Sequence, residues 1–164
     1  EPIGTAVRTV AAMEAAALKE MPIAVVLRYG AFYGPGTWYA EGGDLATRIR
    51  KRGYPIVGAG KGMTSFIHVD DAAEAACAAL NAPASGVYNI VDDEPAPASV
   101  WMPVYAAAMG APAPLRVPAL LTRLALGKPL TKWITSMRGA SNRAAAVQLG
   151  WRPRHSTWRE GFRA

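Results

Sequence analysis

The most constraining feature of the sequence is a continuous apolar run, PIAVVLR at residues 22–28, in which polar and apolar side chains do not alternate. A β-branched run of this kind is typical of a strand that is buried on both faces, as in a parallel sheet. The run GVYNIV at residues 86–91 has the same character. An Ala-rich stretch without Gly or Pro predicts a helix over residues 5–20. The chain is therefore expected to fold as an α/β protein.

The rest of the chain is expected to be mostly helical. A basic helix is predicted at residues 43–52, and Asp70 is expected to cap a second helix that stops at Asn81. Residues 54–69, between these helices, read as two short strands around a Gly-rich turn. Further helices are predicted at residues 100–109, 118–126, 129–137 and 142–149, and a last one starts at Ser156. The C-terminal part should therefore form a smaller helical lobe.

Charge is divided unevenly along the chain. Residues 116–164 hold ten Lys or Arg and a single acid, Glu160, whereas residues 1–115 carry a small excess of acids. The basic residues stand singly among apolar ones, so solvated helix faces are the expected explanation. One wall of an anionic-ligand site is the alternative, and nucleic acid is an unlikely partner.

Several classes of protein are not indicated. Cys77 has no second cysteine to bond with, and no apolar run reaches the length of a membrane span or resembles a leader. We therefore expect a cytoplasmic protein that makes no use of a membrane. His68 and His155 are far apart in sequence, so no metal site is predicted. The chain begins with Glu1 rather than Met, and we expect it to be a piece of a longer protein.

Three polar segments have ordinary structural interpretations. GAGKG, at residues 58–62, lacks the spacing of a P-loop, so we interpret it as a hairpin turn rather than a ligand contact. Asp92, Asp93 and Glu94 follow a strand and are expected to be solvated carboxylates rather than an acid–base pair. His68 is expected to be half-buried and bonded to backbone.

Four segments, taken in order, resemble one family: VVLRYGAFYGPG, TSFIHVDDAAEA, GVYNIVDDEP and SNRAAAVQLGWRPRHSTWREGF. The chain resembles the C-terminal half of the extended short-chain dehydrogenase/reductases, the NAD(P)-dependent epimerase/dehydratase group. The resemblance implies the C-terminal part of a Rossmann-type doubly wound parallel sheet plus a small, mostly helical substrate lobe. It also implies that the dinucleotide fingerprint lies in a missing N-terminal half. In this single incomplete unit, the Rossmann part would be residues 1–40 and 66–92, and the substrate lobe residues 41–65 and 93–164.

The resemblance implies a cofactor, NAD or NADP, and gives roles to the loop after the first strand. The residues that would face the cofactor are Tyr29, Gly30, Ala31 and Phe32. The residues that would bind a small-molecule substrate are Tyr33, Trp38, Met63, Thr64 and Arg138. The physics of the loop agrees, because glycine allows close approach of the backbone and aromatic side chains exclude water. A packed turn with core aromatics is the alternative.

The chain departs from the family at its catalytic pair. If Glu14 is the Glu that many members carry eight residues after the catalytic Tyr, the Tyr-x-x-x-Lys pair falls on Ala6 and Val10. Neither residue can move a proton, so the catalytic residues are unknown. If the chain belongs to an enzyme, we expect an NAD(P)-dependent reductase or epimerase. The alternatives are a cofactor sensor of the same fold and a stand-alone interaction module.

Two further departures from the family pattern concern the substrate. Sugar-nucleotide epimerases typically carry Asn where Ala31 stands, and an Arg that grips the diphosphate near residues 63–65, which here are Met, Thr and Ser. The resemblance therefore implies a substrate other than a sugar nucleotide.

Buried parallel strands require neighbours, so we expect the missing N-terminal half or a second copy of the chain to cover them. The helix at residues 5–20 is expected to lie at a dimer interface.

Overall fold

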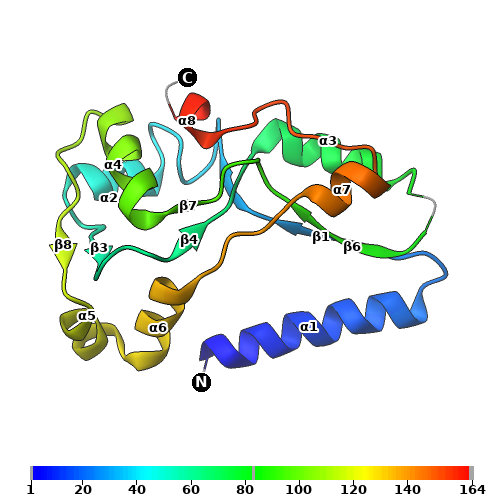
Figure 1. The fold of residues 1–164 in the computed structure, drawn as a ribbon, viewed down its shortest axis with the longest axis horizontal. Coiled ribbons are helices and arrows are strands. Elements are labelled where there is room, and N and C mark those ends of the chain that lie inside the picture. The colour runs from blue at the N-terminus through cyan, green and yellow to red at the C-terminus, as the bar shows by residue number, and fades with distance from the viewer. Residues whose placement is uncertain (1, 83, 163–164) are drawn as a thin grey trace.

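The computed structural model describes residues 2–82 and 84–162, in which helices and short strands alternate (Figure 1). The helices are α1 (Pro2–Glu20), α2 (Asp44–Arg50), α3 (Val69–Ala79), α4 (Ala98–Ala108), α5 (Ala119–Leu126), α6 (Lys128–Ser136), α7 (Arg143–Gln148) and α8 (Trp158–Gly161). The strands are β1 (Val25–Tyr29), β2 (Ala31–Tyr33), β3 (Ile56–Val57), β4 (Met63–Thr64), β5 (Phe66–His68), β6 (Gly86–Ile90), β7 (Ala96–Pro97) and β8 (Arg116–Val117). No helix in the described part of the chain is both long and apolar enough to cross a membrane.

The strands form four pairs, of which three are parallel. β1 pairs with β6 from Val25 opposite Gly86 to Tyr29 opposite Ile90, β2 pairs with β5, and β3 pairs with β8. The pair β4–β7 is antiparallel. The predicted α/β fold with parallel strands is therefore confirmed. β1 begins three residues later than predicted, because Pro22 has no N–H for a strand ladder and residues 21–23 bend instead.

The Gly-rich segment at residues 58–62 is not the predicted hairpin turn. The strands on either side of it, β3 and β4, pair with β8 and β7 and not with each other. A Cβ on Gly60 would lie 2.9 Å from the backbone nitrogen of Ser99, and a Cβ on Gly62 would lie 1.9 Å from the carbonyl oxygen of Ile134. These glycines are present because two other helices, α4 and α6, approach the segment closely. The prediction of two strands in residues 54–69 was also wrong, since the structure has β3, β4 and β5 there.

Strand β5 separates two hydrophobic cores. Phe66 belongs to a core rich in aromatic side chains, which joins β2, α2, α4 and α8. Its neighbour Ile67 belongs to a second core, in which Tyr88 and Ile90 of β6 pack against α3 and α7. Successive side chains of a strand point to opposite faces, and so one short strand serves both cores.

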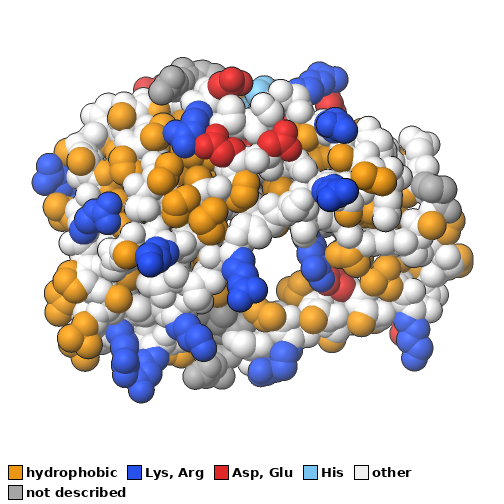
Figure 2. Space-filling model, in the orientation of Figure 1, with side chains coloured by type: hydrophobic (Ala, Val, Ile, Leu, Met, Phe, Trp, Pro, Cys, Tyr) orange, Lys and Arg blue, Asp and Glu red, His pale blue; other side chains and the backbone are white. Residues whose placement is uncertain are grey.

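Helix α1 stands apart from both cores. It runs below β1 and β6 in Figure 1, and the space-filling view shows an opening between it and the rest of the molecule (Figure 2). Its main link to the body is Glu14, whose carboxylate accepts hydrogen bonds from Nε and Nη2 of Arg28 on β1. These bonds lower the pKa of Glu14. Val7, Val10 and Met13 are exposed, and β1 pairs only with β6, so its other edge is open in the described chain.

Candidate functional site

A cavity with a volume of about 650 Å³ is lined mostly by residues 53–137. One wall is the hairpin of α5 and α6 (residues 119–136), and α4 forms another. The loops around β3 and β4 complete it. The lining is apolar and aromatic, with side chains that include those of Val57, Trp101, Met102, Leu121, Trp133 and Met137. A pocket of this size and character is suited to a small organic ligand.

The polar groups of this cavity are few and uncharged. The residues that line it carry the hydroxyls of Tyr39, Tyr54, Thr64 and Thr122 and the indole N–H groups of Trp101 and Trp133. No Lys, Arg, Asp, Glu or His is among the described residues that line the cavity. The site can therefore hold a ligand by apolar contact and neutral hydrogen bonds, and offers no cation to a diphosphate.

The predicted cofactor residues form a sharp connection between two strands. Gly30 donates to the carbonyl of Ile90 (3.0 Å), and Ala31 donates to that of Ser65 (2.8 Å). A Cβ on Gly30 would lie 2.7 Å from the Ser65 carbonyl oxygen, so glycine is required there by the neighbouring chain itself. Ala31 lines the cavity.

Two aromatic rings project from the same connection. Tyr29 and Phe32 are 37% and 42% exposed, and their ring centroids lie 5.3 Å apart. Ligands of open α/β sheets bind beyond the carboxyl ends of the parallel strands, and this pair stands at that end of β1. Exposed aromatic faces at this end of the sheet are suited to packing against a flat ring.

The five predicted substrate residues are not brought together. Thr64 lines the cavity, whereas Trp38, Met63 and Arg138 do not, and the side chain of Trp38 is 70% exposed. Tyr33 is fully buried in the aromatic core, where its ring packs edge-on against Phe66, and its hydroxyl has no hydrogen-bond partner among the described residues.

Sequence reasoning missed most of the cavity lining. Tyr39, Tyr54 and Trp101 come from three segments that only the fold brings together. No local pattern in the sequence marks the lining, because Leu121, Leu126 and Trp133 of the α5–α6 hairpin look like core side chains, and only the structure shows that they are about half exposed.

A second polar cluster lies where β5 meets α3. His68 is buried, and its Nδ1 accepts a hydrogen bond from the backbone nitrogen of Asp70 (3.2 Å). The predicted backbone bond of His68 is thus confirmed, but His68, and not Asp70, caps the helix. The rings of His68 and His155 stack with centroids 3.8 Å apart. Burial, followed by the neighbouring His155, lowers the pKa of His68.

The side chain behind this stack is Asp71, which is fully buried. Its carboxylate accepts hydrogen bonds from the backbone nitrogens of Arg154 (3.0 Å) and His155 (2.9 Å), and it lies 3.1 Å from Nδ1 of His155. The cluster therefore holds the C-terminal segment against α3. No set of described side chains could hold a metal ion.

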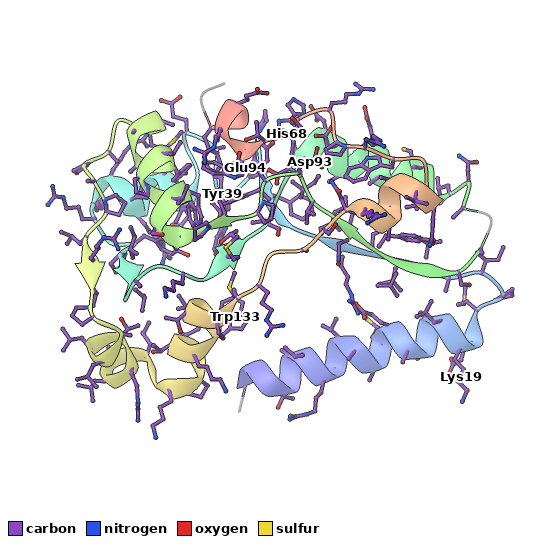
Figure 3. All side chains as sticks on the ribbon, viewed as in Figure 1. Lys19, Tyr39, His68, Asp93, Glu94 and Trp133 are labelled. Atoms are coloured by element: carbon purple, nitrogen blue, oxygen red, sulfur yellow. The ribbon has the colours of Figure 1, made fainter. Side chains whose placement is uncertain are left out.

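The acidic run at residues 92–94 is not the solvated loop that the sequence suggested. Asp92 is 1% exposed and accepts from the backbone nitrogen of Trp158 (3.0 Å). Asp93 accepts from the side-chain amide of Asn142 (2.7 Å), and Glu94 accepts from Nε of Arg159 (2.7 Å). Figure 3 shows Asp93 and Glu94 at the top of the molecule, below α8. All three carboxylates bind the C-terminal region, about 50 to 65 residues further along the chain.

Asp92 should make stability fall as pH rises. Burial raises its pKa to about 7, from an ordinary value near 3.8. Between these two values the folded state binds more protons than the unfolded state, so the free energy of unfolding decreases with increasing pH. Asp92→Asn should remove this contribution. The measurement is the urea-unfolding midpoint of both proteins at four values between pH 5 and pH 8.

The difference between the two curves isolates Asp92 from His68, whose lowered pKa acts in the opposite direction. Parallel curves for the two proteins would show that Asp92 is charged throughout this range.

Comparison with known proteins identifies relatives of this arrangement. Residues 6–91 match the NAD dependent epimerase/dehydratase family. A Streptomyces protein described as a 3-diazoavenalumate denitrifying reductase is 46% identical over 156 residues, which are 95% of this chain and 51% of the relative. The chain thus spans about half the length of the curated relative that it matches.

Solved structures of similar fold also extend beyond the chain. The human epimerase family protein SDR39U1 with NADPH has a TM-score of 0.68 at 22% identity, over 85% of this chain and 46% of that one. A Thermus thermophilus UDP-glucose 4-epimerase in complex with NAD has a TM-score of 0.57 at 25% identity, over 85% and 44%. The shared fold is that of a partial Rossmann-type protein, and these structures contain both forms of the nicotinamide cofactor.

Proposed function

The chain belongs to the NAD-dependent epimerase/dehydratase family, and from this premise we propose that it is the C-terminal, substrate-binding portion of an NAD(P)-dependent reductase. The Streptomyces relative, whose name describes the reduction of a diazo compound, favours a reductase over an epimerase. Residues 1–40 and 66–92 would complete a Rossmann domain, and residues 41–65 and 93–164 would form the substrate lobe. The open edge of β1 supports this division, because the preceding strands of a doubly wound sheet would pair there.

The substrate in this proposal is a small molecule other than a sugar nucleotide. The observation that carries the proposal is the uncharged lining of the 650 Å³ cavity. A sugar nucleotide brings two phosphate charges, which proteins bind with Arg, Lys or clustered backbone N–H groups. An apolar cavity would desolvate these charges without compensation.

The cofactor, NAD or NADP, would lie against the connection between β1 and β2. Tyr29 and Phe32 would shield its ring from water, and the short Gly30–Ala31 connection would set the distance between that ring and the cavity. When bound, the cofactor supplies hydride transfer. Tyr33, which is buried, would act here by fixing the turn that follows β2.

A cofactor sensor of the same fold is the second candidate. Ala6 and Val10 precede Glu14 at four-residue spacing, so the three side chains share one face of α1. Glu14 places that face toward β1. Ala6 and Val10 provide no proton donor on this face, which favours a protein that binds the cofactor without ordinary catalysis.

The first test is a titration of the full-length gene product with NADH and with NADPH, followed by fluorescence. Binding of one of them in the micromolar range, and its oxidation on addition of aromatic diazo or carbonyl compounds, is the expected result. Binding without oxidation by any such compound would favour the sensor. No binding of either nucleotide to a folded protein would exclude both and leave an interaction module.

The proposal also includes partners that cover the apolar surface and the open strand edge of this chain. The exposed apolar side chains of α1 and the open edge of β1 would be covered by the N-terminal half or by a second copy of the chain in a homo-oligomer. A cytoplasmic location belongs to the same proposal, because nicotinamide-dependent reduction draws on the cytoplasmic cofactor pool.

A further inference from the structure

We propose that the 650 Å³ cavity selects a planar aromatic substrate that carries an oxygen acceptor, and that the hydroxyls of Tyr39 and Tyr54 recognise this oxygen. The inference rests on the proposed function and deepens it, because the ligand would be the compound that the reductase acts on. It names a substrate class and two residues that determine specificity.

The shape of the cavity supports a flat ring. α4 contributes Trp101 and Met102 to one wall, and Trp133 of α6 and Met137, the residue after this helix, contribute to another. Aromatic and thioether side chains make favourable contacts with the faces and edges of an aromatic ring. In Figure 3, Tyr39 lies above Trp133, on the side of the molecule that holds α4 and α6.

Tyr39 is held in place by its neighbours. Its ring stacks on Phe162 at a centroid distance of 5.9 Å and an angle of 8°, and it meets Trp101 and Tyr105 edge-on at 5.9 and 5.6 Å. Its carbonyl oxygen accepts a hydrogen bond from the Tyr105 hydroxyl (3.2 Å). The hydroxyl of Tyr39 itself has no hydrogen-bond partner in the described chain, although the residue lines the cavity. The donor is therefore fixed in position before a ligand arrives.

Tyr54 supplies a second hydroxyl to the same cavity. It also lines the cavity, and its hydroxyl has no hydrogen-bond partner in the part of the chain that the structure describes. Its proximity to Tyr39 is reflected in the pKa of Tyr39, which burial raises first and the nearby Tyr54 raises further. Burial raises the pKa of Tyr54 as well. Both phenols therefore stay protonated at neutral pH, and each can donate a hydrogen bond to a ligand oxygen.

Neutral donors determine what kind of oxygen is recognised. The oxygen of a phenol or carbonyl group satisfies two neutral hydroxyl donors, whereas a diphosphate needs opposing positive charge. The remaining hydroxyls, on Thr64 and Thr122, belong to other walls and can bind a second polar group. A ligand without any acceptor would leave the two donors unpaired, which lowers its affinity.

The test compares 4-hydroxycinnamate with cinnamate, which differ by one hydroxyl, by isothermal titration calorimetry on the full-length gene product. We expect the hydroxylated compound to bind about tenfold more tightly, the value of one net hydrogen bond in a desolvated site. Tyr39→Phe and Tyr54→Phe should each reduce this preference to about threefold or less. Circular dichroism spectra and thermal midpoints like those of the unmodified protein show that both variants fold.

Tyr88→Phe is the matched control. The Tyr88 hydroxyl donates to Gln148 (3.0 Å), and the residue is not in the cavity lining, so the tenfold preference should persist. Equal affinity for the two compounds in the unmodified protein would overturn the inference. The same holds if the preference survives in Tyr39→Phe and Tyr54→Phe, or if UDP-glucose displaces cinnamate.

Failure of this inference can be distinguished from failure of the proposed function. A gene product that binds NADH or NADPH but does not distinguish the two cinnamates overturns only the substrate class. A gene product that distinguishes them through Tyr39 and Tyr54 but binds neither nucleotide retains the recognition site and loses the reductase.

Discussion

Replacing Asp71 with alanine is expected to lower the free energy of unfolding of the full-length gene product by about 3 kcal/mol. The carboxylate is fully buried and accepts from the backbone nitrogens of Arg154 and His155. Alanine leaves both N–H groups and the imidazole of His155 without their acceptor, and an unmet donor in a desolvated site costs about 1–3 kcal/mol. Urea unfolding followed by circular dichroism measures the loss.

The adjacent Asp70 provides the control for Asp71. Its side chain is 76% exposed and lies 3.7 Å from Nδ1 of His68, which is a weak interaction. Asp70→Ala should therefore change the free energy of unfolding by less than about 0.5 kcal/mol. Limited proteolysis should cut Asp71→Ala near residue 154 and spare the control. Equal losses in the two variants would mean that the C-terminal segment is held elsewhere.

Gly62→Ala is expected to destabilise the protein by about 2–3 kcal/mol and to weaken ligand binding in the cavity. A Cβ at this position would lie 1.9 Å from the carbonyl oxygen of Ile134, and the obstacle is helix backbone rather than a movable side chain. Helix α6 cannot easily move away, because the backbone nitrogen of the adjacent Met63 donates a hydrogen bond to the carbonyl of Met137 (2.9 Å), directly after this helix. Gly62, Ile134 and Met137 all line the cavity, so the strain deforms it.

Gly42→Ala separates this contact from the general effect of losing a glycine. A Cβ on Gly42 would meet nothing within 4 Å, and the residue does not have a positive φ. This substitution should be neutral or slightly stabilising, because alanine restricts the unfolded chain. The paired measurement is the thermal midpoint of both variants together with the affinity for 4-hydroxycinnamate. A Gly62→Ala protein as stable as the control would show that α6 can move away freely.

The sequence predicted the fold well where its signals are local. The apolar runs that became β1 and β6, and the Ala-rich α1, are short-range patterns that few other structures satisfy. The Gly-rich segment at residues 58–62 led to the wrong prediction of a hairpin turn, because glycine is equally typical of a turn and of a site where another segment of the backbone approaches closely. The nearby backbone of Ile134 is more than 70 residues away in sequence, and only the folded chain reveals it.

The candidate site was predicted less well, for a related reason. Asp92 and Glu94 look like solvated acids until their partners near residue 158 are known. Tyr39 and Tyr54 carry no motif of their own, and only the folded chain places them with Trp101 and Trp133 in the lining of one cavity. The resemblance to a family predicted cofactor-binding residues in the loop after β1. The lining of a substrate cavity varies with the substrate, so a shared motif contains little information about that lining.

The division of β5 between two cores has a consequence for how this region can change in evolution. Phe66 and Ile67 can each be replaced by side chains of similar volume, because each faces only one core. Deleting or inserting a single residue next to them would exchange the two faces and place every side chain of the strand in the wrong core at once. Natural relatives should therefore vary in residue type along β5 but keep its length, and should accept insertions next to Leu80, which is exposed directly after α3.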